Sequence, residues 1–303
     1  MNPTLPSLLV ITNANAGTNE AAVLDPIVDR WREQTEVEVA ATGSPDELAD
    51  VLEDVDGRRV VVAGGDGSLH AVVKALVVGD LLDDAEVALL PLGTGNDFAR
   101  GVGIPLECDE AACLVLNGTA RPADVITDDA DGIVINNVHV GASAQASRYG
   151  ARWKERLGRY GLGKLGYPIG AALASVRPPY IRLDVLVDGQ RIVSRRRPIL
   201  MLSVGNSSHV GGGTPITPEA TPEDGKADVM ISFATGPLAR FGYVLRMRKG
   251  EHQERDDVLR VRGRVVWIKG SKFWCSADGE ITGPHRSRRW VVHQGALQMV
   301  LPK

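Results

Sequence analysis

Short apolar runs alternate with stretches of helical periodicity through the first 125 residues. Four runs have the length of a strand, namely Leu8–Thr12, Val37–Ala41, Val60–Ala63 and Val87–Leu90. Continuously apolar strands separated by helices are typical of a parallel sheet that is covered on both faces. We therefore predict an N-terminal α/β domain with three layers and a mostly parallel sheet.

The segments between these runs carry helix signals. Apolar residues recur at helical spacing from Val23 to Trp31, and Pro26 is expected in the first turn or at a bend. Ser44 to Glu47 form a capping box with proline at the first helical position, which predicts a helix through Leu52. Further helices are expected at 69–78 and 109–116.

The pattern changes after about residue 128, where runs of strand type dominate. They are Ile133–Val138, Ile181–Val187, Ile199–Val204, Val229–Phe233, Val265–Ile268, Trp290–His293 and Leu297–Leu301. Asp188-Gly189 predicts a hairpin turn, and Pro237–Lys249 predicts a short amphipathic helix with four basic residues. We interpret this part as a mainly antiparallel β-sandwich.

Composition narrows the class of protein. The 303 residues suit two domains, and 44% hydrophobic with 24% charged residues is ordinary for a globular protein. A net charge of -4 gives no support to nucleic-acid binding. The three cysteines and six histidines show no zinc spacing and no disulfide framework, which favours a reducing cytoplasm. No apolar run approaches the roughly 20 residues that span a bilayer.

A glycine-rich loop follows the strand at 60–63. Gly64 to Ser68 (GGDGS) stand between this strand and the next helix. Glycines allow close approach of a ligand, and free amides at a helix start attract phosphate. Asp66 is unusual beside phosphate, and it fits if Mg²⁺ lies between them or if it orients another group. A plain turn with a helix cap is the alternative.

A second loop of the same kind follows the strand at 87–90. Pro91 to Arg100 (PLGTGNDFAR) contain two glycines around Thr94, and then Asn96 and Asp97. Both loops should meet at the carboxyl edge of the sheet, where open α/β folds bind ligands. Asp97 as a helix cap alone is the simpler interpretation.

Together, GGDGS and PLGTGNDFAR resemble the two signature loops of the diacylglycerol kinase catalytic domain family. The first loop is shared with NAD kinases, whereas the second is particular to the lipid kinases, which include sphingosine and ceramide kinases. Asn13–Gly17 is similar to the N-terminal nucleotide loop of the family, with Ala14 in place of its proline. Val210–Gly213, Pro222–Asp228 and Ser276–Glu280 resemble its later motifs.

The resemblance implies ATP and Mg²⁺ as cofactors and assigns roles to individual residues. ATP would contact Asn13, Gly17, Thr42, Gly64, Gly65, Gly67, Ser68, Gly93, Thr94 and Asn96. Asp66 and Asp97 would organise Mg²⁺ and the catalytic network, and Glu280 would be the general base that accepts the proton of the substrate hydroxyl. A structural Mg²⁺ would take the side chain of Asp224 and the backbone carbonyls of Thr221 and Lys226.

Asp278 would face the same side as Glu280 if both lie in a strand, where it could bind Mg²⁺ or orient a partner. The change of pattern after residue 128 gives the first domain limit, and the resemblance implies that the last strand returns to the first domain. A nucleotide-binding domain would span 1–128, a β-rich domain for the lipid substrate would span 129–295, and 296–303 would return to the first domain.

Several points stay open at this stage. A lipid substrate implies peripheral contact with the inner membrane surface, and a homodimer is left open. A basic and aromatic segment, with Arg148, Tyr149, Arg152, Trp153, Lys154, Arg156, Arg159, Tyr160 and Lys164, is either a membrane-facing surface or a solvated helix.

A NAD kinase is disfavoured by the second loop. A catalytically inactive nucleotide sensor is disfavoured because Asp66, Asp97 and Glu280 are present together. The lipid alcohol, most simply diacylglycerol, cannot be assigned from these motifs.

Overall fold

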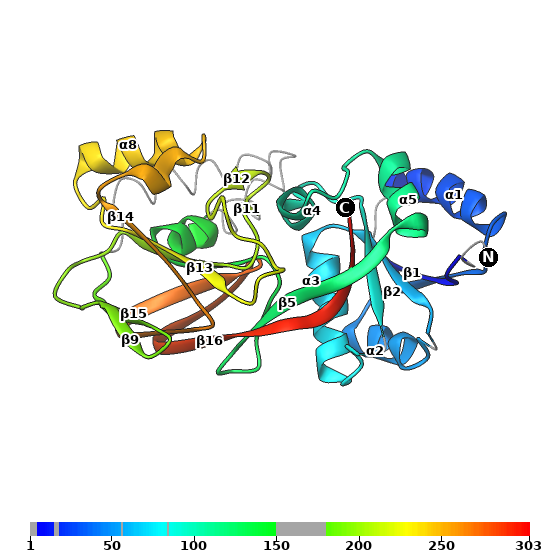
Figure 1. Ribbon diagram of the computed structural model, residues 1–303, viewed down its shortest axis with the longest axis horizontal. Helices are drawn as coiled ribbons and strands as arrows, with labels where there is room; N and C mark the ends of the chain where they lie inside the picture. The colour runs from blue at the N-terminus through cyan, green and yellow to red at the C-terminus, as the bar shows by residue number, and fades with distance from the viewer. Residues whose placement is uncertain (1–4, 15–17, 56, 84, 150–179) are drawn as a thin grey trace.

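Two lobes lie side by side and are joined by two long strands (Figure 1). The computed structural model describes residues 5–14, 18–55, 57–83, 85–149 and 180–303 of the chain. Within these ranges most strands belong to one 14-stranded sheet that runs through both lobes. None of the described helices is long and apolar enough to cross a membrane.

The first lobe is a three-layer α/β domain, as predicted. Its parallel strands are β1 (Leu8–Asn13), β2 (Val37–Thr42), β3 (Arg59–Gly64) and β4 (Glu86–Pro91), in the order β4-β3-β1-β2. Its helices are α1 (Thr18–Arg32), α2 (Pro45–Glu53), α3 (Asp66–Val78), α4 (Asp97–Val102) and α5 (Cys108–Asn117).

Alternation along the strands produces two separate cores in this lobe. Val60 and Val62 pack with α2 and α3 on one face of the sheet, whereas Val61 and Ala63 pack with α1 and α5 on the other. Because every strand residue from 60 to 63 is buried, the run looks uniformly apolar in the sequence.

Local signals place most helix boundaries correctly. Ser44 Oγ accepts a hydrogen bond from Glu47 N–H at 3.2 Å, so the predicted cap of α2 is present. Pro26 lies inside α1, eight residues after Thr18, and not in its first turn. The alternative, a bend at Pro26, stays a prediction. The strong apolar face formed by Leu24, Ile27 and Trp31 keeps this helix intact.

The second lobe is mainly antiparallel. Its strands are β6 (Ile133–Val134), β7 (Asn137–Gly141), β8 (Leu183–Val187), β9 (Gln190–Val193), β10 (Met201–Gly205), β13 (Ala227–Ser232), β14 (Val258–Gly263) and β15 (Val265–Ala277), with the small ribbon β11 (His209–Val210) and β12 (Thr214–Pro215). The helix α8 (Pro237–Met247) and the short 3-10 helix η2 (Glu251–Glu254) follow β13. Asp188-Gly189 forms the predicted hairpin turn, with both residues at positive φ.

The strand β15 gives the second lobe its sandwich shape. It pairs with β8 over its first half and with β7 over its last residues, with register shifts between Lys269 and Cys275. Such irregularities bend a strand, so the sheet folds over the core of the second lobe, which includes Leu202, Val229 and Trp290.

Strands β5 (Thr119–Asp128) and β16 (Glu280–Leu301) connect the lobes. They are antiparallel to each other over most of their length, and Gln298 and Met299 of β16 pair in parallel with β4. The predicted strands at 290–293 and 297–301 are therefore one strand, interrupted by an irregularity between His293 and Leu297. Asp124 stabilises that irregularity by accepting Gly295 N–H at 2.8 Å.

Candidate active site

Two loops meet at the carboxyl edge of the parallel sheet. The loop from β3 to α3 and the loop from β4 to α4 touch backbone to backbone at Gly65 and Gly93. A Cβ atom built on Gly93 would lie 2.5 Å from Gly65 Cα, so only glycine fits there. The two loops predicted from the sequence therefore form one surface.

Asp66 holds the second loop in place. Its carboxylate accepts hydrogen bonds from Asp97 N–H at 3.0 Å and Phe98 N–H at 2.9 Å, which are the first amides of α4. The preceding residue, Asn96, has a φ of 51° and binds the carbonyls of Pro91 and Gly93 through Nδ2. The aspartate of the first loop thus caps the helix of the second.

Asp97 connects the two lobes. Its carboxylate accepts Gly212 N–H at 2.9 Å and Gly213 N–H at 2.7 Å, from the glycine-rich loop of the second lobe. Positive φ at Gly211, Gly212 and Gly213 turns these amides toward one point.

Asp278 binds amides of its own lobe and lies beside a histidine of the first lobe. It sits at a φ of 43° in the turn between β15 and β16, and its carboxylate accepts the N–H groups of Ile135, Asn136 and Asn137 at 2.7–3.0 Å. On its other side lies His70 Nδ1 of α3, at 3.1 Å.

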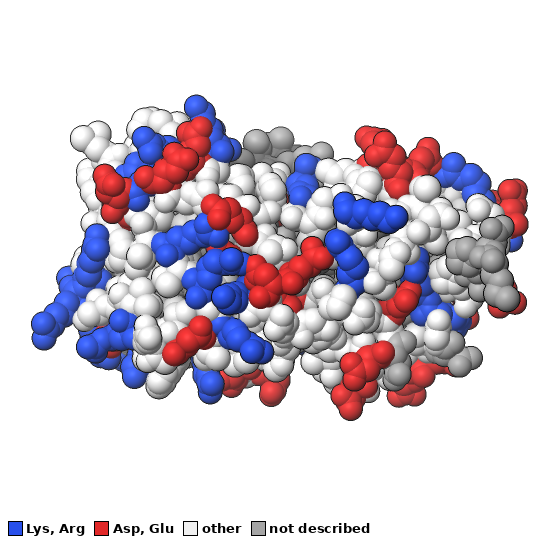
Figure 2. Space-filling view, in the orientation of Figure 1, with Lys and Arg blue, Asp and Glu red and all other residues white. Residues whose placement is uncertain are grey.

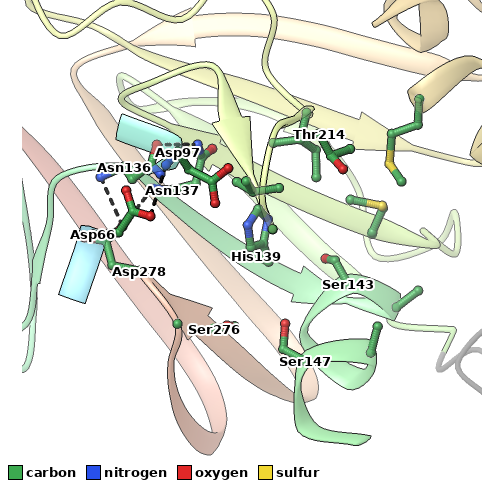
Figure 3. A pocket seen from close by; sticks show the side chains of 18 of the residues that line it. Asp66, Asp97, Asn136, Asn137, His139, Ser143, Ser147, Thr214, Ser276 and Asp278 are labelled. Atoms are coloured by element: carbon green, nitrogen blue, oxygen red, sulfur yellow. Dashed lines mark hydrogen bonds between the residues drawn. The ribbon is translucent and has the colours of Figure 1, made fainter. Parts of the chain in front are cut away.

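The three carboxylates form one electrostatic group. Burial raises the pKa of Asp66, and the neighbouring Asp97 and Asp278 carboxylates raise it further, against the lowering effect of the two amide hydrogen bonds. A Cβ atom on Gly95 would lie 3.1 Å from Asp66 Oδ2 and 3.5 Å from Asp97 Oδ2, which shows how close these two oxygens are. Figure 3 shows the three aspartates at one end of a pocket.

Features that suit phosphate surround this group. The helix α3 begins at Asp66 without a side-chain cap, and a Cβ on Gly67 would meet no atom within 4 Å, so the first turn of the helix is open. Asn13 and Thr42 end the neighbouring strands β1 and β2 in register, at the same edge of the sheet. Thr94 is exposed in the second loop. Gly17 lies outside the described residues.

A cavity of about 500 Å³ extends from the carboxylates into the second lobe. Asp66, Asp97 and Asp278 line one end. Apolar side chains line the other end, among them Leu200, Met201, Ile216, Tyr243 and Met247. Ser143, Ser147 and Thr214 provide isolated hydroxyl groups in that part (Figure 3).

His139 stands between the two ends of the cavity (Figure 3). Burial lowers its pKa to about 4, so the ring is neutral at physiological pH. Its Nδ1 lies 3.2 Å from Ser203 Oγ. A neutral imidazole can offer one hydrogen bond to an uncharged polar group in the cavity.

Glu280 begins β16, two residues after Asp278. Glu280 is exposed. The adjacent Gly279 lines the cavity, whereas Glu280 is not one of the described residues that line it. Asp278 and Glu280 do not share a strand, because Asp278 and Gly279 form the turn between Ala277 and Glu280. Asp278 therefore fixes the hairpin end that carries Glu280.

The predicted ligands of a structural Mg²⁺ lie elsewhere, near Asp124. Asp224 forms an ion pair with Arg262 and accepts Lys226 N–H, so a guanidinium already neutralises its carboxylate. A cation on Asp224 would have to displace Arg262 from this ion pair. Among the described residues, no group of three or more His, Cys, Asp or Glu side chains is arranged to hold a metal ion. The assignment of Thr221, Asp224 and Lys226 stays a prediction.

Some contacts of the site had no signal in the sequence. His70 and His139 are two of the six histidines that show no zinc spacing, so the sequence pointed to no role for either in the site. The glycines at 211–213 were noted only as a motif. Of the basic and aromatic segment, residues 150–164 lie outside the described residues, and Arg148 stacks on Trp274 at 4.0 Å from the ring centroid.

Comparison with known proteins gives two family matches. Residues 7–127 match the diacylglycerol kinase catalytic domain, and residues 136–301 match the YegS C-terminal NAD kinase beta sandwich-like domain. Together the two matches cover both lobes.

Two curated relatives are similar over most of the chain. A protein of Stenotrophomonas maltophilia (strain K279a) named "Probable lipid kinase YegS-like" is 31% identical over 97% of this chain and 95% of its own length. A diacylglycerol kinase of Bacillus subtilis (strain 168) is 31% identical over 74% of this chain and 71% of its own length.

A solved structure supports the fold alone. A diacylglycerol kinase from Bacillus anthracis str. Sterne superposes with a TM-score of 0.72 at 18% identity, over 99% of this chain and 98% of the other.

Proposed function

We propose that this chain, a lipid kinase of the diacylglycerol kinase catalytic domain family, acts on diacylglycerol. It would transfer the γ-phosphate of ATP to the free hydroxyl of that lipid. The product would be phosphatidic acid. The observation that carries this proposal is the cavity, which is apolar at one end and lined by carboxylates at the other.

The apolar end suits acyl chains. Leu200, Met201, Ile216 and Met247 offer no charge and no strong hydrogen bond, so this end favours hydrocarbon over the polar ribose and base of NAD. A lipid placed with its chains there would direct its hydroxyl toward Asp66, Asp97 and the hairpin end at Asp278.

The nucleotide would lie on the sheet edge formed by the two glycine loops. The open first turn of α3 offers amides to the phosphates, and Gly65 and Gly93 let the backbone approach them. The side chain of Asn96 leaves Oδ1 buried without a hydrogen-bond partner, which is consistent with a ligand group that donates to it.

The residues fit a divalent cation at Asp66 and Asp97. The two carboxylates are close together. Burial and the neighbouring carboxylates raise the pKa of Asp66, so its charged form would be stabilised by a cation. Mg²⁺ commonly takes one or two carboxylates and completes its shell with phosphates and water, so a larger cluster of protein ligands is not required. When bound there, the cation would neutralise charge that builds on the phosphates.

Glu280 would accept the proton of the lipid hydroxyl. An alcohol is a weak acid, so a carboxylate must take the proton as the oxygen attacks phosphorus. Glu280 is exposed at the start of β16, next to a residue that lines the cavity, and Asp278 holds that end of the hairpin through three amides. Asp278 is then a positioning residue.

The test uses labelled ATP and a total lipid extract, followed by identification of the labelled lipid. Wild-type protein should label phosphatidic acid, and Glu280→Gln should lower the rate by at least about a hundredfold, since a general base contributes roughly 10²–10⁴. ATP binding, followed as thermal stabilisation, should not change. Glu53→Gln, at an exposed glutamate on α2, serves as the matched control.

Three results would reject parts of this proposal. NADP formation without lipid labelling would reject the lipid acceptor. Labelling of a different lipid alcohol would reject diacylglycerol alone. Full activity of Glu280→Gln would reject the assigned base.

A further inference from the structure

The helix α8 has two apolar sides. Tyr243 is buried and Met247 is half-buried, and both pack on a small core with Leu200 and Ile216. The opposite side carries Leu238, which is 87% exposed, with Phe241 and Leu245. A helix that packs against a single core needs only one apolar side, so the outer side requires another explanation.

The exposed side chains are grouped rather than scattered. Leu238, Phe241 and Leu245 follow the spacing i, i+3, i+7, which places them on one face. Tyr180, also exposed, donates from its hydroxyl to Thr235 O just before the helix. Single exposed apolar residues are ordinary on a soluble protein, but a contiguous group marks an interaction site.

Cations border this face at the end of the helix. Arg246, Arg248 and Lys249 are exposed, and none forms an ion pair within the described part of the chain. The acidic residues Glu251 and Glu254 come only after the turn at Gly250, in η2. Figure 2 shows basic and acidic side chains beside uncharged ones over the part of the surface where α8 lies.

The same helix covers the substrate cavity. Its inner side chains Arg240, Tyr243, Val244 and Met247 line the cavity, so α8 forms part of its wall. Figure 1 shows α8 at the outer edge of the second lobe, away from the parallel sheet of the first. A lipid bilayer in contact with the outer face of α8 would therefore lie next to the proposed site for the acyl chains.

We propose that α8 docks on an anionic lipid bilayer, with Leu238, Phe241 and Leu245 inserted among the lipids and Arg246, Arg248 and Lys249 on the anionic headgroups. Interfacial helices combine an apolar face of Leu and Phe with Lys and Arg beside it, as α8 does. Docking in this orientation would let a lipid pass from the bilayer into the cavity. The link to the cavity rests on the proposed function, whereas the docking itself does not.

The test measures cosedimentation with vesicles of phosphatidylcholine and phosphatidylglycerol, using the full chain. Leu238→Ser/Phe241→Ser/Leu245→Ser should weaken binding at least about tenfold, because the inserted apolar area is lost. Arg246→Gln/Arg248→Gln/Lys249→Gln should weaken it by about fivefold per charge, and only when phosphatidylglycerol is present. Val23→Ser/Val78→Ser, at exposed apolar positions of the first lobe, should bind as the wild type does.

Kinase assays distinguish the docking proposal from the proposed function. The apolar variant should phosphorylate a short-chain diacylglycerol dispersed in water at the wild-type rate, and lose activity only on vesicles. A protein that binds vesicles through α8 but phosphorylates no lipid would reject the function and keep the docking surface. Wild-type vesicle binding by the apolar variant would reject the docking surface, and so would a dimer in solution that this variant converts to a monomer.

Discussion

His139 illustrates how burial controls a single residue. Its ring faces the cavity, and burial lowers its pKa to about 4 from an ordinary value near 6.5. As the pH falls below 6.5, the unfolded chain takes up a proton on this ring before the folded chain does. The folded state therefore loses stability between pH 6.5 and pH 4, and no further stability is lost to this group below that range.

We expect His139 to lower the free energy of unfolding by up to about 1.4 kcal/mol for each unit by which the pH falls in this range. His139→Gln should remove that part of the slope, as measured by chemical denaturation across the same pH range. Equal slopes in wild type and His139→Gln would mean that the ring is not buried as neutral imidazole.

The sequence predicts which loop residues come together better than it predicts what they do. The loops of Asp66 and Asp97 were expected at one sheet edge, and the structure brings them together there. The hydrogen bonds of Asp97 and Asp278 were not expected. Asp97 accepts from Gly212 and Asp278 accepts from Asn136, and each partner is more than a hundred residues away in the sequence. Only the tertiary fold supplies such contacts, so the catalytic roles stay predictions.

At the scale of elements, the site depends on the contact between the loops that follow β3 and β4. Gly93→Ala should force the loops apart, since the new methyl would lie 2.5 Å from Gly65 Cα. We expect a loss of about 1–3 kcal/mol in stability and a large loss of ATP binding.

Gly67→Ala provides the matched comparison. A methyl there meets no atom within 4 Å, and Gly67 lies in the first turn of α3, so stability should not fall. Thermal denaturation of both variants checks the expectation. A stability loss at Gly67→Ala as large as at Gly93→Ala would show that helix geometry, and not the loop contact, is the cause.

Element boundaries were predicted well where the signal is local and poorly where it is not. The cap of α2 and the hairpin at Asp188-Gly189 depend on adjacent residues, and both are present. The polar break at 293–296 looked like the end of a strand, although β16 continues through it. The distant Asp124 accepts Gly295 N–H and so stabilises the irregularity, which no local pattern could indicate.

At the scale of the molecule, one sheet runs through both lobes and contributes to apolar cores in each. We expect the lobes to unfold together, because β5 and β16 contribute to both. Leu202→Ala, in the core of the second lobe, should cost about 2–5 kcal/mol. The free energy of opening that hydrogen exchange reports for amides in β3 of the first lobe should fall by the same amount. Val78→Ala, at an exposed position, should change neither lobe.

Faster exchange confined to β7, β10 and β13 would contradict this expectation. The lobes would then be separate folding units that share strands without sharing stability. The family assignment would not change, since both family matches stand on the sequence.

The strand β16 also determines when the enzyme can first work during its own synthesis. The glycine loops, β4 and β5 leave the ribosome early, but the partner that pairs with both strands is made only with residues 280–301. Glu280 lies at the start of that same strand. The nascent chain therefore holds both glycine loops before the sheet beside them is complete. Under the proposed mechanism, phosphoryl transfer would wait until the strand with Glu280 has been added.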